Sequence, residues 1–115
     1  MSEATVYKVL TAEQMAGLEE TRSFAGSPDD QRDGFIHLST AAQLPGTLER
    51  HFAGQADLHL CAVDTDAAGK ALKWEVSRGG DLFPHLYAPL TLDEVVAYSP
   101  LAYEPDGSLR LPVTG

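Results

Sequence analysis

The sequence has almost no cysteine, no long apolar run and few basic residues. Its single cysteine, Cys61, rules out a disulfide within the chain. Because Cys61 lies in the apolar run 58–63, we predict a buried structural thiol there instead of a nucleophile. No apolar stretch reaches the roughly 18 residues of a membrane-spanning helix, and the first residues lack the pattern of a signal peptide. We therefore expect a cytoplasmic protein without a membrane partner.

Basic residues are scarce, since 8 Lys and Arg stand against 17 Asp and Glu, for a net charge of -9. Such a charge repels phosphate backbones, so non-specific binding to nucleic acid is not expected. A phosphate-bearing small molecule is still a candidate ligand where local donors can hold it. With so few cations, any arginine close to a pocket is informative.

Common catalytic and metal-binding motifs are also missing. The sequence contains neither GxGxxG nor the P-loop pattern, and it has no GxSxG nucleophile elbow. The histidines show no HExxH motif and no paired spacing typical of metal ligands, so no metal is expected. There are four of them: His37, His51, His59 and His85.

The chain of 115 residues is long enough for one hydrophobic core, so residues 1–115 are predicted to form a single domain. Residue alternation and apolar runs predict strands at 5–10, 35–39, 58–64, 72–76 and 95–98. The strand at 58–64 is nearly continuous in apolar residues, which indicates burial on both faces. Proline and glycine predict exposed loops over 23–33 and 78–84.

Helices are predicted mainly in the first half of the chain. A capping box at Thr11 begins one helix that continues to about Glu20. A second helix ends at Gly54 and begins either at the capping box of Thr40 or with Pro45 in its first position. Early helices and late strands, without regular alternation, favour an α+β fold with two to three short helices.

The segment 33–40 is the first candidate for a binding site. If neighbouring apolar residues face the core, His37 points toward a cleft or solvent, and Ser39 projects on the same side two residues later. This arrangement is natural for a paired donor and acceptor. The alternative is a partly buried histidine that is bonded to a nearby backbone group.

The segment 74–87 is the second candidate. Alternation on its strand puts Trp74 toward the core and leaves Glu75 as the accessible carboxylate. His85 and Tyr87 share a face if the chain is extended. The same segment could also be no more than a surface charge and a structural turn.

A Gly-Gly pair in this second segment has a backbone freedom that suits anion binding. Gly79 and Gly80 allow close approach of a ligand, and successive amides can form an anion-binding nest. Arg78 could supply a planar fork for a phosphate or carboxylate. The alternative is an ordinary tight loop in which Arg78 pairs with Asp81 or Glu75.

Three stretches, YKVL at 7–10, GFIHLS at 34–39 and WEVSRGGDLFPHLY at 74–87, resemble the bacterial "domain of unknown function 952" family. The resemblance covers about residues 6–101. The family is grouped with the ADP-ribosyltransferase-like proteins, which implies an α+β fold with two small abutting sheets and an NAD-sized cleft between them. It therefore implies NAD, or a similar nucleotide, as the small-molecule ligand.

The resemblance also implies roles for the candidate residues. His37, with Ser39 or Thr40, would bind ribose hydroxyls, and Tyr87 would stack on the nicotinamide ring. Charge that develops as the nicotinamide-ribose bond breaks would be stabilised by a carboxylate. Glu75 or Asp81 would stabilise that charge. The guanidinium of Arg78 and the amides of Gly79 and Gly80 would bind the pyrophosphate. His85 would complete the catalytic set.

No late glutamate motif typical of the superfamily can be matched, and this keeps two classes of function open. One is an NAD-using transferase or glycohydrolase. The other is a non-catalytic pocket protein that binds a nucleotide or a small anionic metabolite. Both require that His37 and His85 face one hollow, whereas a simple interaction module requires no such proximity. The sequence does not define the oligomeric state.

Overall fold

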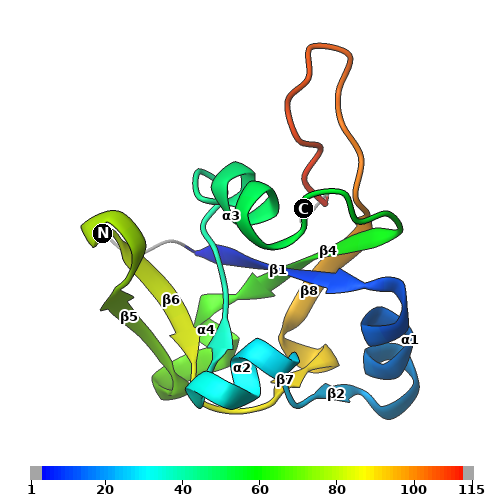
Figure 1. Cartoon of the computed structure of the whole chain (residues 1–115). Helices are drawn as coiled ribbons and strands as arrows, with labels where there is room; N and C mark the ends of the chain where they lie inside the picture. Colours follow the sequence, from blue (N-terminus) through cyan, green and yellow to red (C-terminus); the bar gives the residue numbers. More distant parts are fainter. Residues whose placement is uncertain (1–3, 113–115) are drawn as a thin grey trace.

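A three-stranded antiparallel sheet forms the centre of the molecule (Figure 1). The computed structural model describes residues 4–112, apart from the side chain of Arg78. The strand order is β1 (Thr5–Thr11), β4 (Leu58–Asp64) and β8 (Val95–Pro100). Five of the seven residues of β4 are buried, so the predicted central strand with two buried faces is confirmed.

A second three-stranded sheet has the order β3 (Ile36–His37), β6 (Leu82–Leu86) and β5 (Leu72–Val76). A two-stranded pair is formed by β2 (Ser23–Phe24) and β7 (Leu90–Thr91). The two larger sheets meet where Tyr7 and Ser39 exchange backbone hydrogen bonds of 2.7 and 2.9 Å. The chain that carries His37 is therefore held against the edge of β1.

Four α-helices lie around these sheets in residues 4–112. They are α1 (Ala12–Thr21), α2 (Pro28–Asp33), α3 (Leu44–His51) and the single-turn α4 (Thr65–Ala68). Three short 3-10 segments join strands, namely η1 (Gly69–Ala71), η2 (Arg78–Gly80) and η3 (Leu92–Glu94). The small α+β architecture is thus confirmed, with one helix more than expected. Within this part of the chain, no helix is long and apolar enough to cross a membrane.

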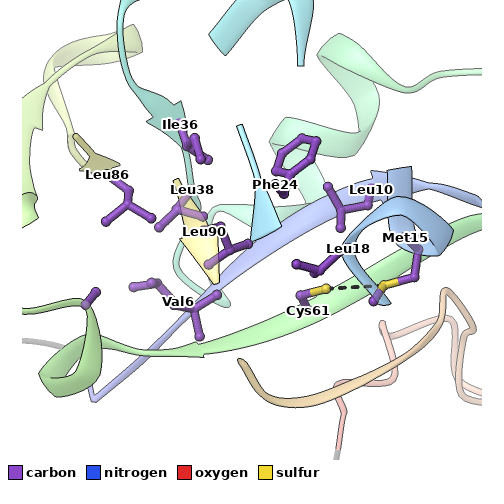
Figure 2. Packing of buried hydrophobic residues seen from close by; sticks show 12 residues of the cluster. Val6, Leu10, Met15, Leu18, Phe24, Ile36, Leu38, Cys61, Leu86 and Leu90 are labelled. Carbon is purple, nitrogen blue, oxygen red and sulfur yellow. Dashed lines mark hydrogen bonds between the residues drawn. The ribbon is translucent and has the colours of Figure 1, made fainter. Parts of the chain in front are cut away.

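The core occupies both faces of the central sheet. On one face, Val6 and Leu10 pack with Leu18, Leu38 and Leu86, all at most 2% exposed (Figure 2). A second cluster on the other face contains Tyr7, Val9, Leu44 and Leu60. Each such side chain contributes about 1.5–3 kcal/mol on burial. This division matches the alternation of β1.

The single cysteine lies inside the first of these clusters. Cys61 is fully buried, with its sulfur 3.6 Å from that of Met15 (Figure 2). Burial raises the pKa of the Cys61 thiol to about 12. The thiol is therefore protonated and inert, as the apolar run around it predicts.

The exposed loop predicted for 23–33 is wrong, because this segment contains β2 and α2. Ser27 caps α2: its Oγ accepts from the Asp30 amide at 3.2 Å, and its own amide donates to Asp30 Oδ2 at 2.9 Å. Pro28 occupies the first turn, where its missing N–H costs nothing. Ser27, Pro28 and Asp30 together form a helix start, although the same residue types are also typical of loops.

The loop predicted for 78–84 is also wrong in its second half, because β6 begins at Leu82 and includes Pro84. The Pro84 carbonyl accepts from the Leu38 amide at 3.0 Å. In an antiparallel strand the N–H of a residue points to the same side as its carbonyl. The nitrogen of Pro84 therefore faces the β3 side of the sheet, just past His37, where β3 ends. At this position the sheet tolerates a residue without a backbone N–H.

The start of α3 combines both alternatives that the sequence left open. Thr40 and Gln43 form a reciprocal capping pair at 3.0 and 3.2 Å. The helix itself begins only at Leu44, with Pro45 in its first turn. A capped turn therefore precedes the helix, and Pro45 loses no intrahelical hydrogen bond.

Candidate functional site

The sheet β3-β6-β5 separates a core face from a site face. Trp74 lies opposite Pro84, and Ile36 lies opposite Leu86, all on the core side. The alternate residues of the same three strands point the other way. These are His37, Phe83, His85, Lys73 and Glu75. Phe35, just before β3, and Tyr87, just after β6, have their rings on the same side. Strand alternation thus gathers the two predicted histidines and Glu75 on one surface.

His37 and His85 are direct partners in the β3–β6 register. Their ring centroids are 5.7 Å apart and the rings meet edge to face. Both line a cavity of about 200 Å³ between β1, α2, α3 and the β5–β6 hairpin. The two imidazoles that sequence analysis assigned to one hollow therefore do face the same cavity.

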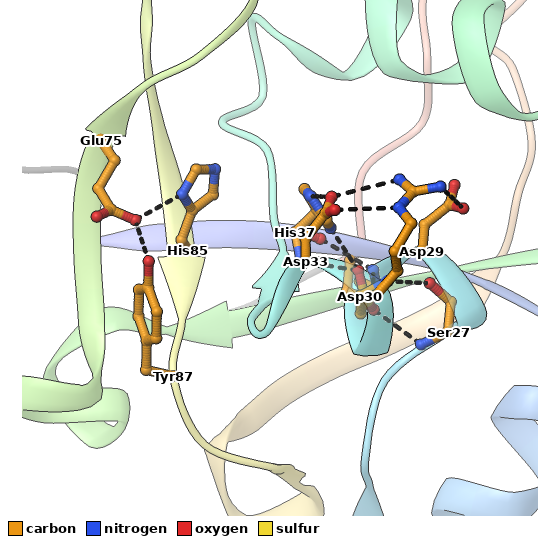
Figure 3. Close-up of polar contacts among 10 residues, drawn as sticks. Ser27, Asp29, Asp30, Asp33, His37, Glu75, His85 and Tyr87 are labelled. Carbon is orange, nitrogen blue, oxygen red and sulfur yellow. Dashed lines mark hydrogen bonds and ion pairs between the residues drawn. The ribbon is translucent and has the colours of Figure 1, made fainter.

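His37 lies between two carboxylates of α2 (Figure 3). Its Nδ1 is 2.6 Å from Asp30 Oδ1, and its Nε2 is 3.0 Å from Asp33 Oδ2. The His37 amide also donates to Asp30 Oδ1, at 3.0 Å. The Nδ1 atom and the backbone amide of His37 are thus bonded to Asp30, and its Nε2 atom is in contact with Asp33 of the same short helix.

Asp30 is 2% exposed and forms a buried ion pair with Lys8 of β1. Lys8 Nζ lies 2.9 Å from Asp30 Oδ2 and donates to the His37 carbonyl at 3.0 Å. Burial raises the pKa of Asp30, but hydrogen bonds from His37 and the charge of Lys8 outweigh it and hold the pKa well below its usual range. Burial lowers the pKa of Lys8, against the attraction of Asp30.

Gly26 makes room for this buried carboxylate. Its φ of 119° is a conformation that L side chains rarely adopt, and a Cβ there would lie 2.8 Å from Asp30 Cβ. The chain can therefore pass close to α2 only with glycine at this position.

His85 has a different partner on the opposite side of the site (Figure 3). Its Nδ1 lies 2.8 Å from Glu75 Oε1, which also accepts from the Tyr87 hydroxyl at 2.7 Å. Hydrogen bonds from Tyr87 and then His85 lower the pKa of Glu75, and the bond to Glu75 raises the pKa of Tyr87. The carboxylate predicted as accessible is 40% exposed, but it supports His85 and does not line the cavity.

Phe35 joins the two halves of the site. Its ring stacks on His85 at 4.0 Å with an interplanar angle of 22° and lies 4.6 Å from His37. A ring between two imidazoles restricts the rotation of both, which favours fixed orientations of their nitrogens.

Ser39 and Thr40 differ in their position. Ser39 is 4% exposed, lines the cavity and shares a 2.8 Å hydroxyl contact with Thr47 of α3. Thr40 does not line the cavity, and its hydroxyl accepts from the Gln43 amide in the turn before α3. The structure therefore brings Ser39, but not Thr40, to His37 and His85.

The Gly-Gly pair forms the exposed turn of the β5–β6 hairpin. Gly79 and Gly80 have φ values of 69° and 82°, which explains why glycine suits both positions. The Gly80 amide donates to Ser77 at 3.1 Å, and the Ser77 amide donates to Asp81 at 2.9 Å. Ser77 lines the cavity, whereas Gly79, Gly80 and Asp81 do not. The side chain of Arg78 lies outside what the structure describes.

Tyr87 is also away from the cavity. Its ring is 43% exposed and lies 5.2 Å from that of Phe35, and its hydroxyl is bonded to Glu75. The phenylalanine and tyrosine residues that do line the cavity come from β1, from the position just after α3 and from β6. They are Tyr7, Phe52 and Phe83.

Several polar residues of the site were missed by sequence analysis, among them Lys8, Asp30, Asp33 and Arg32, which lines the cavity and pairs with two of the aspartates of α2. Lys8 carried a signal, because a lysine between apolar residues on one face of a strand needs a buried partner. Asp30 carried another in its spacing of three residues from Ser27. Asp33 follows from neither, since only the packing of α2 against β3 brings it to His37. Among the described side chains, no three His, Cys, Asp or Glu residues are placed to hold a metal ion.

Comparison with protein families gives one match over most of the chain. Residues 9–98 match the model of the family described as "Protein of unknown function (DUF952)". The chain belongs to the DUF952 family. The family match lies within the span 6–101 that the sequence motifs indicated, and it contains both histidines and all their partners except Lys8.

Solved structures of one other protein are similar to this chain. A crystal structure of protein CC0527 from Caulobacter crescentus is 42% identical, with a TM-score of 0.83, and the match covers 92% of this chain and 93% of that one. A solution NMR structure of CC0527 is 43% identical, with a TM-score of 0.77 and coverage of 91% and 90%. No curated protein matches the chain. These comparisons assign the family and the fold but no activity.

Proposed function

We propose that this protein is an ADP-ribosyltransferase-like enzyme that breaks the nicotinamide-ribose bond of NAD in the cavity of His37 and His85. The grouping of the family with that fold is part of the proposal. NAD enters as the substrate, and water or another hydroxyl compound is the acceptor.

The observation that carries the proposal is the pair of imidazoles over one cavity, 5.7 Å apart, each bound to a carboxylate. A carboxylate on one ring nitrogen fixes the tautomer and the orientation of an imidazole. Two imidazoles fixed in this way are suited to proton transfer at one bound molecule. A chance surface histidine rarely has such a partner.

The acidic groups of the cavity agree with cleavage at a ribose carbon. Three carboxylates of α2 line it, from Asp29, Asp30 and Asp33, together with the cations Lys8 and Arg32 that pair with them. Breaking the bond between C1′ and nicotinamide develops positive charge on the ribose, and nearby carboxylates stabilise such charge.

The size of the cavity limits which part of NAD enters it. Its volume of about 200 Å³ is below the roughly 300–1,000 Å³ of sites for drug-sized ligands. It suits a ribose with its nicotinamide ring, with the rest of the dinucleotide along the rim. Ser39 and His37 would contact ribose hydroxyls, and Phe83 lies better for the nicotinamide ring than Tyr87 does.

In the proposed reaction the C1′–N bond breaks and its electron pair leaves with neutral nicotinamide. A water molecule or an acceptor hydroxyl forms the new bond to C1′ and loses a proton to an imidazole. Glu75 would act through His85, which it orients. Contacts of the pyrophosphate with Arg78 and the amides of Gly79 and Gly80 remain part of the proposal, at the rim beyond Ser77.

A second function, binding without catalysis, is favoured by one specific observation. Glu75, the carboxylate first assigned to the developing charge, does not line the cavity. If Asp33 cannot take over its role, the site would hold a nucleotide or a small anionic metabolite and release it unchanged.

Calorimetric titration with NAD and with ADP-ribose, together with an assay of nicotinamide release, distinguishes the two functions. We expect binding and release by the wild type and loss of release in His37→Gln. His59→Gln is the matched control, because His59 lies on β4 outside the cavity lining. Binding without release would support the non-catalytic function. Absence of binding by both NAD and ADP-ribose would refute the enzyme and the nucleotide-binding form of the second function.

A further inference from the structure

Ser39 belongs to a row of side chains on the cavity floor that runs beside the two histidines. It follows His37 by two residues, and alternate residues of an extended chain lie on one side, about 6.6 Å apart. Its backbone pairs with Tyr7 of β1. The hydrogen bond from the preceding amide to the Pro84 carbonyl places Ser39 next to Phe83 of β6 on its other side. Because Tyr7, Ser39 and Phe83 all line the cavity, the row is a hydroxyl between two aromatic rings.

The hydroxyl of this row is buried and bonded to a second hydroxyl. Ser39 is 4% exposed, and its Oγ lies 2.8 Å from Oγ1 of Thr47, a residue of α3 that also lines the cavity. Within the described residues, Thr47 is the hydrogen-bond partner of the Ser39 side chain. A helical threonine can instead bond its hydroxyl to the carbonyl four residues earlier, as Thr21 does with Gly17 in α1. The α3 helix thus contributes the hydroxyl of Thr47 to the cavity.

The buried carboxylate of the lining has no capacity left for a ligand. Asp30 forms four hydrogen bonds within the protein, and its partners are Lys8, the Ser27 amide, and the amide and ring of His37. A carboxylate has about four lone-pair sites, so these bonds fill them. Lys8 in turn directs two of its three hydrogens to Asp30 and the His37 carbonyl. A ligand at the buried floor must therefore find hydrogen-bond partners elsewhere.

The hydroxyl pair of Ser39 and Thr47 has such capacity. Two hydroxyls that are bonded to each other share one hydrogen, whichever of them donates it. The pair therefore keeps one hydrogen to donate and lone pairs that accept. A primary carboxamide matches this set, because its N–H group donates while its C=O group accepts. A carboxylate has no hydrogen to donate, so it can use only the donor of the pair.

We propose that the hydroxyl pair binds the carboxamide of an aromatic ring that lies between Tyr7 and Phe83. The identity of the ring rests on the proposed function, which makes it the nicotinamide of NAD. Its ribose then lies at the neighbouring row of the two histidines, and the ribose hydroxyls are left to His37. Thr47 is thereby a specificity-determining residue, which selects nicotinamide over nicotinic acid.

The surroundings of the hydroxyl pair favour an aromatic ligand over a sugar. A vicinal diol could also donate and accept, but it has no flat face for the rings of this region. Tyr7 and Phe83 flank Ser39, and Phe52, just after α3, lines the same cavity and packs on the cluster that contains Tyr7. Aromatic side chains make stacked or edge-to-face contacts with a ligand ring of similar size.

Titration of ¹⁵N-labelled protein with free nicotinamide and with nicotinic acid, followed by NMR, tests the proposal without any cleavage step. We expect nicotinamide to shift the amide signals of Ser39 and Thr47. We also expect it to bind about tenfold more tightly than nicotinic acid, which lacks the hydrogen for one of the two bonds.

Variants of helical threonines provide the matched controls. Thr47→Val keeps the shape of the side chain but removes its hydroxyl, so the preference for nicotinamide should fall from about tenfold to less than about threefold. Thr47→Ser keeps the hydroxyl and should retain the preference. Thr21→Val makes the same change outside the cavity lining and should leave both affinities unchanged.

Equal affinities of the wild type for the two ligands, or a preference that survives Thr47→Val, would overturn the proposal, as would absence of nicotinamide binding. Cleavage of NAD by a protein without this preference would refute the role of the pair and leave the proposed function standing. The expected preference without NAD cleavage would refute the enzyme and leave the carboxamide site standing.

Discussion

His37 and His85 face each other across adjacent strands, but their carboxylate partners lie in opposite surroundings. Asp30 is 2% exposed and bonded to Lys8, Ser27 and His37. The Glu75 side chain is 40% exposed, lies on the outer strand β5, and accepts from His85 and Tyr87. The contacts that orient His37 therefore also attach α2 to β1, whereas those that orient His85 stay within the β5–β6 hairpin.

The contacts around His37 are therefore coupled to the stability of the fold, whereas those around His85 are largely independent of it. A charge buried without its partner is strongly destabilising, whereas an exposed pair contributes little to stability. Changes near His37 should thus alter stability and chemistry together. Changes near His85 should alter chemistry alone.

The largest effect is expected for Asp30→Ala. It leaves the Lys8 ammonium buried without a counter-charge and removes the bonds to Ser27 and His37. We expect a loss of about 3–5 kcal/mol in the free energy of unfolding, measured by urea denaturation. Asp29→Ala, on the exposed side of the same helix, should cost at most about 1 kcal/mol. Equal losses would contradict the central role of Asp30.

A double-mutant cycle on Lys8 and Asp30 sharpens this result. Lys8→Met removes the bonds to Asp30 and to the His37 carbonyl but leaves Asp30 its bonds from His37 and Ser27, so we expect a loss of about 1.5–3 kcal/mol. Combined with Asp30→Asn, the loss should be smaller than the sum of the single losses, because no unpaired charge stays buried. Simple additivity in urea denaturation would show that the two side chains do not interact.

Low pH should reduce the stability of the folded protein through protonation of Asp30, the partner of His37. The pKa of Asp30 in the folded protein is below the ordinary value of 3.8, so its contribution to stability is complete above 3.8 and is lost as the pH falls toward the folded pKa. Urea midpoints of the wild type should therefore fall more steeply than those of Asp30→Asn below about pH 4. Parallel curves for the two proteins would be evidence against the shift.

The smallest change in stability is expected for Glu75→Gln. The side chain is largely solvated, so the urea midpoint should stay within experimental error. The pKa of Tyr87, which Glu75 raises, should fall toward the ordinary value of a tyrosine. NMR titration of labelled tyrosine rings measures this shift, and Tyr103 is an internal reference, because it lies outside the site. A large loss of stability would mean that both ends of the site support the fold.

Much of the architecture was predictable because local pattern and burial agree. The alternation of β1, with Val6 and Leu10 on one face and Tyr7 and Val9 on the other, matches the two core clusters. The capping box at Thr11 forms as predicted. The family and the proximity of His37 to His85 were also inferred correctly. In each case the relevant interactions are local or follow from strand periodicity.

The errors arose where one residue type suits two structures. Pro28 and two aspartates are typical of both a loop and the first turn of a helix, and the segment became α2. Pro84 normally argues against a strand, but it is accepted in β6 because β3 ends beside it. Gly79 and Gly80 form a hairpin turn outside the cavity lining, and anion binding by their amides stays a prediction.

Residue patterns along the chain were sufficient to predict five of the strands, the sides on which their residues lie, and the proximity of the two histidines. Which carboxylate each histidine meets was decided only in the folded molecule. Asp30 and Asp33 reach His37 from a helix, Lys8 reaches Asp30 from another sheet, and Glu75 lies diagonally across a hairpin from His85. Periodicity operates over neighbouring residues, whereas the charge and hydrogens of a ring depend on groups brought to it by long-range packing.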